Sequence, residues 1–216
     1  MTHARLRYRF LLFALVFALT CSLAAQPKVD RSGPPAGVSD ALRAAVEDKG
    51  YRVVLNDGWT AEFWFAKPLK VEKKDVPGAL YPELSDGEFI GVVKFAQGMS
   101  DFRGQSLPAG IYTLRYQTLP QDGNHMGVAP NPDFLLASPA EADSRPEQSY
   151  PYKKLVALSA KSTGGSHPAV IALTSASEPG TVTKADTGFI VFSAAVPAAS
   201  GSSVKLGIVI KGAAAQ

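Results

Sequence analysis

The sequence predicts an all-β protein, an antiparallel β-sandwich or jelly-roll-like domain with one short helix near its N-terminus. Two observations support this prediction. Short segments rich in Val, Ile, Phe and Tyr recur along the chain, and clusters of Pro, Gly and Ser separate them. No helical patterns alternate with these segments, as the crossover connections of a parallel sheet would require. The roughly 190 residues after residue 25 are enough for one domain with a substantial core.

Residues 1–25 have the three parts of a secretory signal peptide. Arg5, Arg7 and Arg9 form a basic start, an unbroken apolar run covers 10–19, and small residues suitable for cleavage follow. This run is too short for a membrane-spanning helix, which needs about 20 apolar residues. We therefore expect a secreted or periplasmic protein with no transmembrane segment in its mature chain.

The signal peptide also contains the only cysteine, Cys21. The residues before Cys21 fit a lipoprotein signal poorly, so cleavage near Ala24 or Ala25 is favoured over a lipid anchor. The mature chain would then contain no disulfide, no thiolate nucleophile and no cysteine metal ligand.

The net charge of +3 arises wholly from the signal peptide. The chain has 22 Lys and Arg residues against 19 Asp and Glu residues, and three arginines of the leader make up the difference. The mature chain is therefore close to neutral and has no overall basic charge that would favour nucleic acid binding. We expect no nucleic acid partner.

Residues 26–37 are rich in Pro and Gly and are expected to form a flexible linker before a single domain over 38–216. One helix is expected between Ser39, a good N-cap residue, and Gly50, a good helix end. Apolar residues recur between them at helical spacing: Ala41, Leu42, Ala45 and Val46.

About nine strands are expected after this helix. The segments 51–56 and 59–67 should form a hairpin, because the favoured turn pair Asp57-Gly58 lies between them. The other strands are expected at 88–96, 110–119, 134–138, 154–159, 169–174, 188–196 and 203–211. Two long polar loops, 120–133 and 139–153, are candidate binding segments, since long loops on a rigid β scaffold commonly carry function.

Two loop histidines are candidate metal ligands. His125 and His167 are the only histidines of the mature chain, and with Asp122 they could bind copper or zinc. No two histidines have the close spacing typical of a local metal motif, so the favoured alternative is that each imidazole orders its own turn. We expect no cofactor, with copper or zinc as the alternative.

Trp64 is a candidate for stacking on a sugar ring. Strand alternation places Trp59, Phe63 and Phe65 on one face, which resembles a core face. Trp64 falls on the other face together with polar residues, so it could contact a ligand at the surface. The alternative is that Trp64 packs in the core or at a sheet edge.

Two further ligand contacts are expected in loops. Arg103 could bind an anion, and the alternative is that Asp101, Arg103 and Arg115 form structural ion pairs. Tyr150 ends the segment 144–150, the expected contact surface of the second long loop.

Catalytic signatures are sparse in the sequence. No Gly-x-Ser-x-Gly elbow, phosphate-binding glycine loop or His-Glu-x-x-His motif occurs. Glu141 and Asp143 are paired acids, but they fall in a segment expected to be solvated. We therefore assign no catalytic residue.

Several segments resemble uncharacterised exported bacterial β-sandwich proteins: 101–143, 50–58, 62–67 and 155–170. Within the first segment, LPAGIYTL (107–114) resembles the turn-then-strand motif of the DUF2911-type family, with Ile111 where that motif usually has Thr. The resemblance implies an exported β-sandwich and transfers no catalytic residue.

The sequence as a whole favours an exported, non-catalytic protein that binds a ligand or partner at the cell envelope. The alternative is a periplasmic copper- or zinc-binding protein that uses the loop histidines.

Overall fold

A computed structural model of the chain describes residues 26–72, 76–120 and 129–212. Its elements in chain order are β1 Lys28–Ser32, α1 Asp40–Ala45, β2 Gly50–Val54, β3 Thr60–Phe65, β4 Phe89–Phe95, β5 Met99–Ser100, β6 Ser106–Leu107, β7 Gly110–Thr118, β8 Asp133–Pro139, α2 Tyr152–Thr163, β9 Ala169–Thr174, β10 Thr181–Lys184, β11 Ile190–Pro197 and β12 Ser203–Lys211. The predicted antiparallel all-β class is confirmed. The segment predicted to be a signal peptide, residues 1–25 with Cys21, lies outside the described residues.

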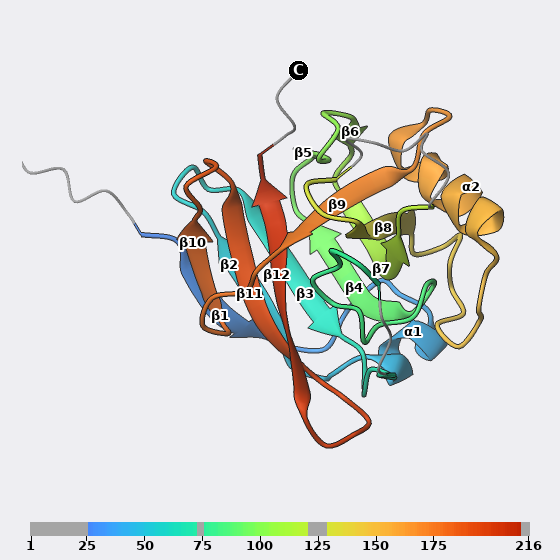
Figure 1. The fold of residues 1–216 in the computed structure, drawn as a ribbon. Helices are drawn as coiled ribbons and strands as arrows, with labels where there is room; N and C mark the ends of the chain where they lie inside the picture. Colours follow the sequence, from blue (N-terminus) through green and yellow to red (C-terminus); the bar gives the residue numbers. More distant parts are fainter. Residues whose placement is uncertain (1–25, 73–75, 121–128, 213–216) are drawn as a thin grey trace, which may run out of the picture.

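Ten strands form one antiparallel sheet that curls almost into a barrel (Figure 1). The strand order is β1-β2-β3-β4-β7-β8-β9-β12-β11-β10, and β5 and β6 form a separate small hairpin. The pairing between β9 and β12 is short, with only Thr174 opposite Gly207 and Leu173 opposite Ile208. The sheet therefore consists of two sections that are joined at a narrow seam.

A tyrosine reinforces this seam. Tyr81, from the long connection between β3 and β4, donates its hydroxyl hydrogen to the carbonyl of Thr174 over 2.6 Å. The same hydroxyl accepts the N–H of Gly207 at 2.8 Å. The carboxylate of Asp133 holds the tyrosine in place by accepting its backbone N–H at 2.8 Å. Tyr81 thus takes the place of ladder hydrogen bonds between the two sections.

The predicted hairpin at 51–67 is confirmed as β2 and β3. Gly58 adopts a φ of +82°, which a glycine tolerates at little cost, and its N–H bonds to the carbonyl of Leu55. The expectation of a flexible linker over 26–37 is wrong for Lys28–Ser32, because these residues form β1 and pair with β2 in regular register. Val29 of β1 packs against the core.

The predicted N-terminal helix is confirmed as α1, which Ser39 caps by accepting the N–H of Leu42 at 3.3 Å. Its predicted end at Gly50 is wrong, because α1 ends at Ala45 and Gly50 begins β2. The predicted strand at 154–159 is wrong, because this segment lies in α2. The buried residues of α2 recur with the period of a helix: Leu155, Leu158, Ser159 and Ser162. Gly164 ends α2 in the left-handed conformation.

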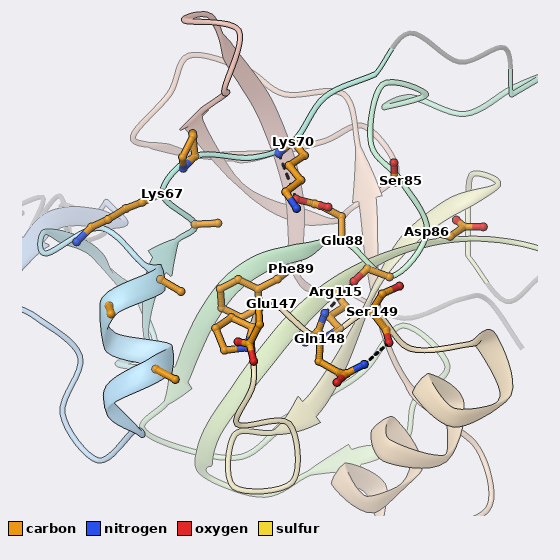
Figure 2. Close-up of a pocket in the computed structure, with 17 residues that line it drawn as sticks. Lys67, Lys70, Ser85, Asp86, Glu88, Phe89, Arg115, Glu147, Gln148 and Ser149 are labelled. Carbon is orange, nitrogen blue, oxygen red and sulfur yellow. Dashed lines mark hydrogen bonds between the residues drawn. The ribbon is translucent and has the colours of Figure 1, made fainter.

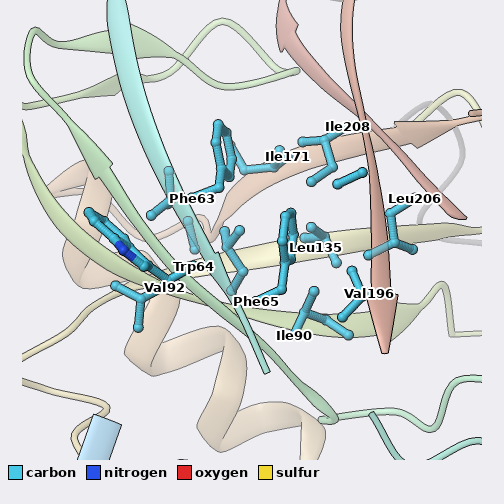
Figure 3. Packing of buried hydrophobic residues seen from close by; sticks show 14 of the residues in the cluster. Phe63, Trp64, Phe65, Ile90, Val92, Leu135, Ile171, Val196, Leu206 and Ile208 are labelled. Atoms are coloured by element: carbon cyan, nitrogen blue, oxygen red, sulfur yellow. The ribbon is translucent and has the colours of Figure 1, made fainter. Parts of the chain in front are cut away.

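Two apolar clusters stabilise the fold. The larger one fills the inside of the curved sheet, where Phe63 and Phe65 of β3 meet Phe192 of β11. Figure 3 shows Phe63 and Phe65 near Leu135 and other residues of this cluster. The smaller one lies between α2 and the outer face of β8 and β9. The hydroxyls of Ser159 and Ser162 fasten α2 to this face by donating to the carbonyl of Ala137. In the described part of the chain, no helix has both the length and the hydropathy for a membrane span.

Candidate functional site

A cleft of about 670 Å³ opens beside α1 (Figure 2). Exposed alanines of α1 form one wall, Ala41 and Ala44 among them, and the loop 146–149 supplies residues of the lining across from it. Residues that follow β3 and residues 85–89 complete the lining. The buried side chain of Leu42 fixes α1 against the core, so its alanines face the cleft on a rigid support.

The base of the cleft holds a fully buried ion pair. Arg115 of β7 is 1% exposed, and Asp143 is completely buried. Nε of Arg115 lies 2.7 Å from Oδ2 of Asp143, and Nη2 lies 2.9 Å from Oδ1, so the pair is bidentate. Thr113 donates its hydroxyl to Oδ2 of Asp143 at 2.7 Å. Arg115 also donates to the carbonyls of Gly87 at 2.9 Å and Arg145 at 3.0 Å.

This network shapes the cleft. Asp143 and Arg145 precede the loop 146–149, while Gly87 lies beside the strand β4. One guanidinium group therefore ties the start of β4 and the start of the loop to the middle of β7. Burial of paired charges is costly unless the remaining donors and acceptors are satisfied, and here four of the five N–H groups of Arg115 have partners.

The rim of the cleft carries charges of both signs. Lys67 forms an exposed ion pair with Asp48 at 2.9 Å. The carboxylate of Glu88 accepts the backbone N–H of Lys70 at 3.1 Å. The ammonium group of Lys70 and the carboxylate of Glu147 have no partner among the described residues, and Figure 2 shows them in different parts of the lining. These two groups are available to a ligand.

Tyr150 is the one predicted ligand contact that the structure places next to the cleft. Its ring is 8% exposed, and its centroid lies 4.9 Å from the guanidinium carbon of Arg115. Burial, reinforced by the charge of Asp143, raises the pKa of Tyr150. Tyr150 therefore supports the base of the cleft through Arg115 rather than facing solvent.

The expectation of a surface contact at Trp64 is wrong. Trp64 is 3% exposed and lies beside Val92 of β4 (Figure 3), and its indole N–H bonds to the carbonyl of Gly33 at 2.7 Å. The cause is the segment 26–37, which packs against the sheet instead of remaining a free linker. The face of β3 that alternation assigns to solvent is therefore also covered.

Arg103 lies on the surface and outside the cleft lining. Its neighbour Asp101 is buried and accepts the N–H groups of Arg103 at 3.0 Å and Gln105 at 2.7 Å. Asp101 therefore orders the turn between β5 and β6. Arg115 does form a structural ion pair, as the alternative reading expected, but with Asp143. The expectation that Asp143 is solvated is wrong.

The predicted metal ligands are only partly described. His167 is exposed between α2 and β9, and its carbonyl accepts the hydroxyl of Thr163 at 2.9 Å. His125 and Asp122 lie outside the described residues, so the proposed pairing of the two histidines stays a prediction. Within the described ranges, no group of three or more His, Cys, Asp or Glu side chains could hold a metal ion.

Sequence reasoning missed the partnership of Arg115 and Asp143. One signal was present: Arg115 interrupts the apolar strand 110–118 at its centre and shares a strand face with Thr113. A charged side chain at the centre of a buried strand needs a buried partner, because an unpaired charge is costly to remove from water.

No family model, no curated protein and no solved structure matches the chain.

Proposed function

We propose that the protein is an exported, non-catalytic binding protein of the cell envelope, built on a sandwich-like β scaffold, and that its ligand occupies the cleft beside α1. Export is inferred from the signal-peptide pattern of residues 1–25. The observation that carries the binding proposal is the buried pair of Arg115 and Asp143, which holds the cleft in shape without a ligand. Preformed concave sites of this kind bind ligands at a low cost in ordering.

The lining favours a short peptide segment over a simple ion. Small apolar side chains of α1 suit the side chains of a peptide, while Lys70 and Glu147 offer opposite charges. A purely anionic ligand would meet Glu88 and Glu147, and a purely cationic one would meet Lys67 and Lys70. A peptide with one acidic and one basic side chain satisfies both sets of charges.

The acids at the cleft other than Glu147 hold structural partners, which supports binding over catalysis. Asp86 accepts the N–H of Thr118 at 2.8 Å, Glu88 accepts the N–H of Lys70, and the buried Asp143 accepts hydrogen bonds from Arg115 and Thr113. These carboxylates hold backbone and side-chain partners, as structural acceptors do.

Calorimetric titration with pooled synthetic tetrapeptides, each with one Lys and one Glu among small apolar residues, tests this proposal. Saturable binding is expected in the wild-type protein. Ala44→Arg should abolish it by filling the cleft from α1. Ala157→Arg is the matched control, because Ala157 is also an exposed helical alanine but lies on α2, away from the cleft. Absence of binding, or equal binding by both variants, would reject the proposal.

A further inference from the structure

A second hollow, of about 500 Å³, lies at the opposite end of β3 from the cleft. Trp59 immediately precedes β3 and lines this hollow, whereas Ala66 and Lys67 immediately follow β3 and line the cleft. The hairpin of β5 and β6 and the end of β12 complete the hollow, and Figure 1 shows these elements on the side away from α1. The two sites are therefore separate.

The ring of Trp59 is held in a fixed position at this hollow. Its centroid lies 5.9 Å from that of Phe95, with the two rings tilted at 35°. Its backbone N–H bonds to the carboxylate of Asp57 at 3.1 Å, and its carbonyl accepts the N–H of Leu55 at 2.9 Å. Trp59 is only half-buried, so part of the indole remains open to the hollow. A ligand could stack on it without reordering the hairpin.

The uncharged polar side chains around this ring have no partner among the described residues. In the described part of the chain, the indole N–H of Trp59 and the hydroxyls of Ser100 and Ser106 have no hydrogen-bond partner. The charged group at the rim is already satisfied, because Lys211 donates to the carboxylate of Asp57. This hydrogen bond lowers the pKa of Asp57, and the charge of its carboxylate offsets that of the Lys211 side chain.

We propose that this hollow binds a neutral sugar residue of an oligosaccharide. A pyranose ring has apolar C–H faces that stack on an indole, and hydroxyls at its edge that exchange hydrogen bonds with serine and indole groups. The half-buried Met99 borders the hollow with apolar surface that extends this contact. An anionic or cationic ligand has no free counter-charge here. The site is independent of the cleft and of its proposed peptide ligand.

The two tryptophans only partly follow the expectation from strand alternation. Trp59 does pack against the core, as expected for its strand face, but it precedes β3 and stays half-buried. Trp64, at the centre of the strand pairing, is buried. Position along the strand therefore decides exposure more than the face does.

The chain contains only two tryptophans, which makes intrinsic fluorescence a specific probe. We expect cellotriose, maltotriose or N,N′,N″-triacetylchitotriose, titrated to about 10 mM, to cause a saturable change in emission. Trp59→Phe should remove this change, since only the buried Trp64 then emits. Trp64→Phe should retain it, because Trp59 is still present.

Calorimetry provides a readout that does not depend on fluorescence. Trp59→Ala should weaken the binding of the active trisaccharide about tenfold or more, as expected for the loss of a central aromatic anchor. The cleft variant Ala44→Arg should bind the sugar with unchanged affinity, which separates this proposal from the peptide site. No saturable binding of any of the three sugars, or unchanged affinity in Trp59→Ala, would overturn it.

Discussion

Asp143→Asn should be strongly destabilising, because it removes the charge that compensates a buried guanidinium. The carboxylate of Asp143 receives hydrogen bonds from Nε and Nη2 of Arg115 and from the hydroxyl of Thr113. An asparagine amide keeps one oxygen acceptor but turns its NH₂ group toward these donors. Arg115, only 1% exposed, would be left without a counter-charge. Breaking a buried pair in this way costs about 3–5 kcal/mol.

The assay is urea unfolding, with the free energy of unfolding extrapolated to water and the m-value compared between variants. Asp48→Asn is the matched control, since it removes the charge of an exposed ion pair with Lys67, in which the side chain of Asp48 is 77% exposed. This control should lose no more than about 1 kcal/mol. Equal losses in the two variants would refute the reasoning.

The paired replacement Arg115→Met with Asp143→Leu distinguishes a lost charge partner from lost packing. It removes both buried charges, so we expect the double variant to be more stable than Asp143→Asn alone. A double variant that is much less stable than Asp143→Asn would show that the hydrogen bonds to Gly87 and Arg145 outweigh the charge pairing.

Two further predictions concern the sheet. Burial raises the pKa of Tyr81 from 10.0 to about 12. The unfolded chain therefore releases the Tyr81 proton at lower pH than the folded protein does. The protonated hydroxyl stabilises the fold below pH 10, and this stabilisation is lost between pH 10 and 12. The free energy of unfolding falls by up to about 1.4 kcal/mol per pH unit in that range. In Tyr81→Phe, the free energy of unfolding measured with urea should decline less steeply between pH 10 and 12. The variant should also lose stability at every pH, because the N–H of Gly207 loses its acceptor. An unchanged dependence on pH would contradict this prediction. Gly91→Ala should prevent stable folding, because its Cβ would lie 2.2 Å from the carbonyl oxygen of Trp64 at a φ of +154°. Gly58→Ala is the control, because open space surrounds its Cβ position. It should cost about 1 kcal/mol in stability, measured by thermal unfolding. Similar melting temperatures for these two glycine variants would count against the close approach of β3 and β4.

Local patterns in the sequence predicted the parts of the fold that depend on local chemistry. The hairpin at 51–67 follows from the turn preference of Asp57-Gly58, and α1 follows from its cap at Ser39. The strand at 203–211 coincides with β12, since apolar residues recur at every second position from Val204 to Ile210. These features need no knowledge of the rest of the chain.

Features that depend on distant partners could not be predicted in this way. Residues 28–32 have little apolar character of their own, and they become a strand because β2 supplies the ladder. The apolar run within 154–159 is short enough to fit a strand or a helix, and packing on β8 decides for α2. The burial of Asp143 could not be predicted from its neighbours in the sequence, because its partner Arg115 lies 28 residues earlier. The candidate site depends on this long-range pair, so only the fold as a whole reveals it.

The central claim, that the cleft beside α1 binds a ligand, is tested most directly by mapping backbone amide chemical shifts during titration with the pooled tetrapeptides. We predict saturable shifts at Ala44, Gly87 and Gln148, which come from three separate segments of the lining, with little change at Ala157. Saturable shifts that spare these three residues, or no shifts at any of the residues that line the cleft, would contradict the claim.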